Sequence, residues 1–249
     1  MKQLLLVALA LPVLLAAPAA AGSPLERRYV EGETLKYKVA ITGVNNGPGY
    51  SGEALTTVKK STDGIFYEEL TWSALKMGDQ EMKVPEDFRM LLSLSPDYRP
   101  SLPSSFPGPS LDTFNFYADL WLAIRQEGIR KPGDKAYFKR SLPNSWAHGN
   151  TLVGYDCIDF DITFTELNQS SGTASVLVKH VPPPGGCSRQ PPAEWMNKPV
   201  MDTANNFFQV QKRDDGKYGT MVGKEFFNVE IKLAMPSGRI LSAAMYNPV

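Results

Sequence analysis

The chain is 249 residues long, and its 26 lysines and arginines balance its 26 aspartates and glutamates, so its formal net charge at pH 7 is zero. Proteins that bind nucleic acid or an anionic membrane surface usually gather basic residues on one face, and this composition predicts no nucleic-acid partner. Hydrophobic residues make up 43% of the chain, which is ordinary for a protein with a packed core and argues against disorder. The length allows one large β domain or two small ones.

The N-terminus has the pattern of a cleavable secretory signal peptide. A single basic residue, Lys2, precedes an apolar run over 4–17, and small residues follow at 19–21. The run has about 14 residues, whereas a membrane-spanning helix needs about 20. We therefore expect cleavage after Ala21. The mature protein, 22–249, is then periplasmic or secreted and is not a transmembrane protein.

Two cysteines are present, Cys157 and Cys187. An even number of cysteines in an oxidising compartment favours a disulfide. A bridge between them would close a loop of about 30 residues and stabilise the fold by roughly 3–4 kcal/mol in the chain-entropy model. Two free thiols or a metal pair are the alternatives, but two cysteines without nearby histidines make a poor zinc site. We expect neither a metal site nor a cofactor.

Alternating apolar and polar residues predict a meander of hairpins over 30–95. In 33–42 the apolar side chains fall on one face and the polar ones on the other, a period of two that is typical of a strand with one wet face. The dipeptides at 63–64 and 78–79 pair glycine with aspartate and predict turns. The same alternation predicts that the following side chains point inward: Phe66, Leu70, Trp72, Phe88, Met90, Leu92 and Leu94.

A single helix follows this strand block. The segment 96–109 is rich in proline and serine, which predicts a linker or a crossover loop. The helix is predicted over 111–126, with Ser110 or Asp112 as its N-cap and Gly128 just after its end. Its apolar residues lie on nearly all sides, so we expect it to be buried against a sheet.

A second strand block is predicted over 135–246. The strand 156–165 alternates most clearly, and 172–181 is expected to pair with it. The proline-rich segment 182–199 and the residues 146–150 are predicted to be loops. The alternation places two sets of side chains inward: Ile158, Phe160, Ile162 and Phe164 in one strand, and Phe227, Val229, Ile231 and Leu233 in another.

These elements predict a mainly β fold of curved antiparallel sheets, a sandwich or a partial barrel, with one packed α-helix. One helix cannot cover two meanders, so the sheets must also curl over each other. We expect one domain over 22–249. A curved sheet with a helix at its mouth tends to enclose an apolar cavity.

Carboxylates are densest at Asp156, Asp159, Asp161 and Glu166. Asp159 and Asp161 fall on one face of a strand, about 7 Å apart at about 3.3 Å per residue. Such a pair could hold a cation or serve as general acid and base, but a solvated strand face is the ordinary interpretation. The spacing of acidic residues around a central glycine that marks a calcium loop is absent from the sequence.

Only His148 and His180 could act as a base near neutral pH. His148 falls in a predicted loop. His180 falls at the end of a strand in line with Val176 and Val178, where an imidazole at the edge of the core is commoner than a catalytic one. The sequence contains neither a Gly-x-Ser-x-Gly turn nor a phosphate-binding glycine loop, and we predict no catalytic residue.

Aromatic side chains crowd the predicted helix and the last strands. An ordinary core would account for them, and the functional interpretation is an apolar cavity for a lipid or a similar ligand. The candidate cavity residues are Phe114, Tyr117, Trp121, Phe160, Phe164 and Phe227.

The opening strand, Gly32-Glu33-Thr34-Leu35-Lys36-Tyr37, and the general order of elements resemble the half-barrel carriers of the bacterial envelope, the LolA and LolB type, and uncharacterised periplasmic domains. In those carriers a strongly curved antiparallel sheet wraps over helices and leaves a hydrophobic concavity that binds acyl chains. The resemblance covers about a quarter of the mature chain. Carriers of this type usually have several helices, and only one is predicted here.

The surplus of alternating strands, with one aromatic helix and no catalytic constellation, indicates a non-enzymatic exported protein. We expect it to bind an apolar, lipid-like ligand or a partner protein of the envelope on a concave β surface. A hydrolase of envelope polymers that uses carboxylates of the 156–166 strand is one alternative. A purely structural module is another.

Overall fold

The computed structural model describes residues 23–42, 49–84, 86, 88–98, 108–139, 144–148, 151–155, 157–184 and 206–247. The predicted signal peptide, Asp156 and Cys187 lie outside these residues, as does most of the predicted loop 182–199. The leader and the disulfide therefore stay predictions.

The described residues form three antiparallel sheets and one helix, which confirms the predicted mainly β fold with one α-helix. The first sheet has the order β1-β2-β3-β4, with β5 on β3; the second has the order β14-β13-β10-β9-β6; the third has the order β12-β11-β8-β7. The strands are β1 (Thr34–Ile41), β2 (Tyr50–Lys60), β3 (Phe66–Met77), β4 (Gln80–Glu81), β5 (Met90–Leu92), β6 (Lys135–Phe138), β7 (Asn144–His148), β8 (Thr151–Tyr155), β9 (Asp159–Asn168), β10 (Thr173–Val181), β11 (Phe207–Lys212), β12 (Tyr218–Gly223), β13 (Asn228–Ala234) and β14 (Arg239–Tyr246). The sheets do not close into a barrel.

The predicted inward faces are confirmed where the strands lie deepest. Phe160, Ile162 and Phe164 of β9 are at most 1% exposed. Val178 of β10 pairs with Ile162 on one side and with Val229 of β13 on the other, so buried residues form a continuous row across the second sheet. Side chains that alternate along a strand share one face, and burial of that face fixes the register of the sheet.

The helix α1 (Gly108–Ile124) begins at Gly108 rather than Leu111. Pro109 falls in the first turn, where its missing N–H group costs nothing because the first amides of a helix have no partner within it. The predicted cap Ser110 lies inside the helix and is fully buried, and its Oγ accepts a hydrogen bond of 2.8 Å from Trp72 Nε1. The cap prediction was wrong because the helix begins before Ser110, at Gly108, with Pro109 in its first turn.

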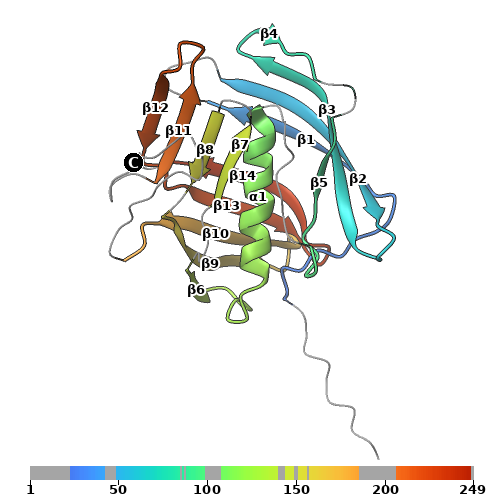
Figure 1. Ribbon diagram of the computed structural model, residues 1–249. Coiled ribbons are helices and arrows are strands. Elements are labelled where there is room, and N and C mark those ends of the chain that lie inside the picture. The colour runs from blue at the N-terminus through green and yellow to red at the C-terminus, as the bar shows by residue number, and fades with distance from the viewer. Residues whose placement is uncertain are drawn as a thin grey trace, which may run out of the picture.

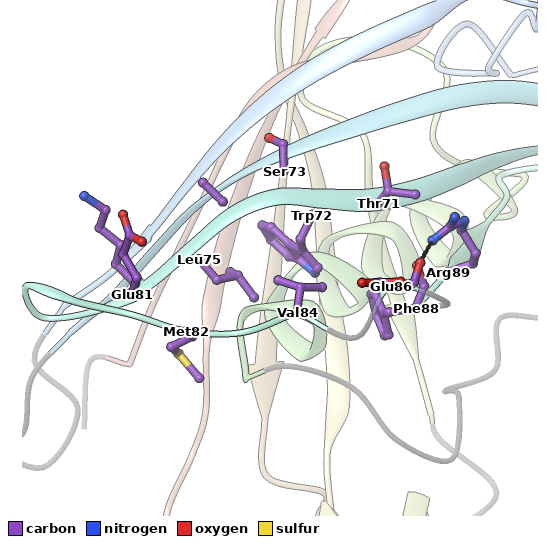
Figure 2. A pocket seen from close by; sticks show the side chains of 12 residues that line it. Thr71, Trp72, Ser73, Leu75, Glu81, Met82, Val84, Glu86, Phe88 and Arg89 are labelled. Carbon is purple, nitrogen blue, oxygen red and sulfur yellow. Dashed lines mark hydrogen bonds between the residues drawn. The ribbon is translucent and has the colours of Figure 1, made fainter.

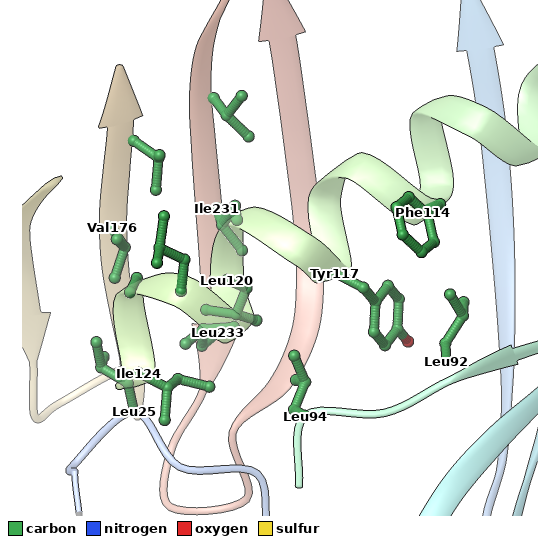
Figure 3. Packing of buried hydrophobic residues seen from close by; sticks show 14 of the residues in the cluster. Leu25, Leu92, Leu94, Phe114, Tyr117, Leu120, Ile124, Val176, Ile231 and Leu233 are labelled. Atoms are coloured by element: carbon green, nitrogen blue, oxygen red, sulfur yellow. The ribbon is translucent and has the colours of Figure 1, made fainter. Parts of the chain in front are cut away.

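Helix α1 lies between the two larger sheets, with contacts to β1, β2 and β5 on one side and to β10 and β13 on the other (Figure 1). Figure 3 shows Leu120 and Ile124 near Ile231 and Leu233 of the second sheet, while Phe114 and Tyr117 lie near Leu92. The buried cluster joins residues of both strand blocks. A helix that is apolar nearly all round is therefore covered on both faces.

Residues 146–148, which fall in the predicted loop 146–150, belong to strand β7 (Asn144–His148). It pairs with β8, which in turn pairs with β11. The backbone hydrogen bonds of the third sheet hold it extended, although its sequence lacks a clear alternation, since sheet context outweighs local propensity.

The N-terminal segment closes one end of the molecule. Leu25 is fully buried, and the amide of Arg28 donates to the carbonyl of Ser237 at 2.9 Å. Gly238, with φ of +67°, lies so close that an added Cβ would be 2.5 Å from the carbonyl oxygen of Glu26. This close approach requires glycine and joins the β13–β14 turn to the segment that precedes β1.

Candidate functional site

A groove of about 1080 Å³ lies between the two larger sheets. One wall is the consecutive run 36–42 of β1 and its end, and the other is the consecutive run 240–247 of β14 and its end. The floor comes from the first half of α1 and from Phe227. Neighbouring side chains of a strand point to opposite faces, so a groove that contacts only one face would be lined by every second residue. Because consecutive residues line both walls, the groove runs along the backbone edges of the two strands.

The groove exists because β1 and β14 are the end strands of separate sheets. β1 pairs with β2 and β14 pairs with β13, and neither has a second strand partner among the described residues. The two strands meet at their starts, where Arg239 Nη1 lies 3.1 Å from Glu33 Oε1. From this ion pair the groove runs along both strands toward their ends.

The groove exposes apolar surface that would otherwise belong to the core. Tyr37 and Val39 of β1 and Met245 of β14 pack against the buried cluster but are only partly buried themselves. Phe116 of α1 and Phe227 are also partly buried, pack against the cluster and line the groove. Apolar side chains that face a groove from several elements are a common feature of binding sites.

A buried polar chain leads away from the floor of the groove. The hydroxyl of Tyr117 donates to Glu68 Oε2 at 2.6 Å, and the hydroxyl of Tyr37 lies 3.5 Å from that of Tyr117. Arg27 Nε lies 3.4 Å from Glu68 Oε1. Glu68 is 1% exposed, and burial raises the pKa of its carboxyl, against the opposing effects of Tyr117 and Arg27.

The same burial raises the pKa of the Tyr117 hydroxyl well above its ordinary value, and the pKa of the Tyr37 hydroxyl is also raised. Both phenols therefore stay protonated and remain hydrogen-bond donors. Arg27 also contacts Glu33 at 2.5 Å, so one ion-pair network links the end of the groove to the polar group beneath its floor.

Charged groups are distributed unevenly over the groove. Asp112 lines it near the start of α1, and burial raises the pKa of its carboxyl to about 6. Lys36 and Lys38 project from the outer face of β1 and share Glu53 at 2.8 and 3.5 Å. The interior of the groove thus carries a carboxyl that is neutral in mild acid, and its outer rim is basic.

Comparisons with protein-family models, with curated proteins and with solved structures found no match for this chain.

The structure brings two of the six predicted cavity residues to the groove, Tyr117 and Phe227. Phe114, Phe160 and Phe164 are buried in the core. Trp121 is partly buried and donates from Nε1 to the carbonyl of Ser95 at 3.0 Å. Aromatic content alone could not separate core residues from groove residues.

The sequence analysis missed the two strand edges that form the walls, and also Asp112 and Glu68 as parts of this site. Alternation identifies a strand but does not show whether both of its edges are paired. A weak signal was present in the two lysines of β1, Lys36 and Lys38, because lysine is common on edge strands.

The carboxylates of the 156–166 strand do not lie in one environment. Asp159 is 2% exposed and accepts a hydrogen bond from the hydroxyl of Tyr137, whereas Asp161 and Glu166 are exposed. Asp156 lies outside the described residues. Within the described ranges, no group of three or more histidine, cysteine or acidic side chains could hold a metal ion.

His180 has a partner that the sequence did not indicate. Its Nε2 lies 2.9 Å from Asp119 Oδ2 of α1, and its ring packs edge-on against Phe160 and Phe227 at centroid distances of 5.0 and 5.8 Å. The side chains of His180 and Asp119 are 9% and 6% exposed. This pair fixes the helix to β10 behind the groove, as expected of an imidazole at the edge of the core.

A second, smaller pocket of about 440 Å³ lies between β3 and the segment that follows β4. Figure 2 shows Trp72 and Leu75 of β3 facing Val84 and Phe88. The guanidinium of Arg89 donates a hydrogen bond to the carbonyl of Glu86. Its larger apolar residues belong to the core cluster or pack against it, so we give it no separate role.

The helix of the described structure is not long and apolar enough to cross a membrane. Cys157 has a positive φ of 59°. The predicted Cys157–Cys187 bridge stays a prediction because Cys187 lies outside the described residues.

Proposed function

We propose that this protein is an exported, non-enzymatic binding protein of the cell envelope that holds an apolar ligand, or an apolar segment of a partner, in the groove between β1 and β14. The observation that supports it best is the set of partly buried apolar side chains that line the groove between the end strands of the two larger sheets.

Binding would cover a side of the core that the described residues leave partly exposed. Apolar surface removed from water contributes about 25 cal/mol per Å². A ligand lying on Phe116, Phe227 and Met245 would bury surface that each of these residues now exposes. The walls are rigid because each is the edge of a multistranded sheet, so the site is largely formed before binding.

The first experiment is native mass spectrometry of the mature protein, purified gently from its own envelope fraction. An added mass that organic extraction removes would support the proposal and report the class of ligand. The same spectrum would show a start at Gly22 if the leader is cleaved as predicted.

A blocking variant localises the binding. Ala243 of β14 is partly buried in the groove, and Ala243→Trp would fill part of the groove with an indole ring. Ala74→Trp is the matched control, because Ala74 lies on β3 at the smaller pocket. Loss of the added mass in the first variant and its retention in the second is the expected result. Equal retention in both, with normal folding, would place the ligand elsewhere.

A further inference from the structure

We propose that the occupant of the groove is an extended polypeptide segment, which adds as a strand between β1 and β14 and joins the two larger sheets. This inference rests on the proposed function of the groove and names the chemistry of its ligand. It depends on the direction of the backbone groups along the two walls.

Among the described residues, no strand pairs with the edge of β1 that faces the groove. At one end of β1 the carbonyl of Glu33 accepts from the amide of Val58 in β2, and at the other end the carbonyl of Ile41 faces Gly49, which directly precedes β2. Both residues are odd-numbered, and the backbone groups of successive residues point to opposite edges of a strand. The amides and carbonyls of Lys36, Lys38 and Ala40 therefore point away from β2 and toward the groove.

The opposite wall is also a strand edge. β14 pairs with β13 from Asn228↔Tyr246 to Ala234↔Arg239, and the described residues supply no partner to its other side. The residues 240–247 line the groove without a break. Two such edges facing one groove offer two ladders of hydrogen bonds to a chain that lies between them.

The two walls match a strand in length and direction. β1 and β14 are 8 residues each, and an extended chain of that length spans about 26 Å at about 3.3 Å per residue. Their starts are held together by Glu33 and Arg239, so the strands run the same way from that ion pair. One inserted segment can therefore be antiparallel to both.

Backbone polarity favours a peptide over an acyl chain. A hydrocarbon chain would cover the apolar floor but would leave the amides and carbonyls of both edges against hydrocarbon, and a desolvated polar group without a partner is costly. A peptide strand covers the same floor and pairs with both edges. Such addition to a sheet edge is an established mode of peptide recognition.

The floor and the rim define the side chains of the segment. Residues that point inward would meet Phe116, Phe227 and Met245 and should be apolar. Residues that point outward would lie beside Lys36 and Lys38, which share the single carboxylate of Glu53, and should be polar or acidic. The structure therefore fits an alternating apolar and acidic segment.

The test begins with selection of random peptides of about nine residues, within the ordinary length of a strand. The mature protein is the bait, and the Ala243→Trp variant removes peptides that bind elsewhere. Selected peptides should alternate, and methylation of their backbone nitrogens on alternate residues should weaken binding by about tenfold or more. In amide-exchange measurements, binding should protect the amides of Lys36, Lys38 and Ala40.

A matched pair of variants removes one edge amide. Lys38→Pro lacks the N–H group that faces the groove, and proline is tolerated on an edge strand when that group points away from the sheet. It should weaken peptide binding by about tenfold relative to Lys38→Ala, which removes the same side-chain charge but keeps the amide. A fluorescent long-chain fatty acid serves as the competing probe.

The outcomes separate the two proposals. Binding of the fatty acid, blocked by Ala243→Trp, without selection of any alternating peptide would overturn the strand inference and leave the proposed function standing. Failure of both probes would overturn both. Peptides that bind without protecting the edge amides would also contradict strand addition.

Discussion

Arg239, the first residue of β14, and Glu33, which directly precedes β1, form an ion pair of 3.1 Å between the two larger sheets. Glu33 also contacts Arg27 at 2.5 Å, and Arg27 in turn lies beside Glu68. The ion pair thus ties the starts of β1 and β14 to the buried N-terminal segment. Beyond it the strands separate and the groove opens.

Replacing Glu33 by Gln should destabilise the protein by about 1–3 kcal/mol, because the buried guanidinium of Arg27 would lose its closest carboxylate. The midpoint of urea unfolding measures the change. Glu53→Gln is the control: its lysine partners are exposed, so the midpoint should change much less. Equal shifts of the midpoint in the two variants would show that the ion pairs of Glu33 stabilise the fold no more than the exposed ion pairs of Glu53.

Tyr117→Phe should destabilise the protein by about 1–3 kcal/mol at neutral pH, because Glu68 would lose a hydrogen bond of 2.6 Å in a buried site. Burial already raises the pKa of Glu68. The contribution of this carboxyl to the free energy of unfolding is therefore most favourable below the ordinary pKa of glutamate and is lost as pH rises. The variant raises that pKa further, and its destabilisation should grow with pH. Tyr98→Phe, which removes an exposed hydrogen bond to Leu91, should show a smaller effect without this trend.

Asp112 makes a pH-dependent contribution that can be measured directly. Burial raises the pKa of its carboxyl from 3.8 to about 6. The folded state therefore binds the proton more tightly than the unfolded state, and stability from this group is present below about pH 4 and is lost as pH rises through about 6. Asp112→Asn should raise the free energy of unfolding at pH 7 by about 2 kcal/mol, and should change it little at pH 4. Thermal unfolding at both pH values checks this, and an equal shift at both would contradict it.

The predicted disulfide can be tested by reduction. If Cys157 and Cys187 are bridged, the oxidised mature protein should weigh two protons less than its reduced form. Reduction should then lower the free energy of unfolding by roughly 3–4 kcal/mol, the loop-closure contribution of about 30 residues. The double variant Cys157→Ser with Cys187→Ser should behave like the reduced protein and should not respond to reductant. An unchanged mass on reduction would exclude the bridge.

Several features of the fold could be predicted because they are local. The alternation of Ile158, Phe160, Ile162 and Phe164 predicted the buried face of β9 and of the residue before it, and all four are at most 3% exposed. A helix apolar on nearly all sides could only be stable with cover on both faces, as the contacts of Leu120 and Tyr117 show. The strand at Asn144–His148 was missed because its extended shape comes from pairing with β8.

The sequence by itself determined the class of structure, since period-two alternation, turn residues and one apolar helix each follow from the covalent geometry of a few neighbouring residues. Only the tertiary structure decided which strands would be edges, and that β1 and β14 would face each other across a groove. Edge status depends on the presence or absence of a partner far away in the chain, and Arg239 lies about two hundred residues from Glu33. The same distance explains why Tyr117 and Phe227 reach the groove while Phe160 and Phe164, equally aromatic in sequence, lie in the core.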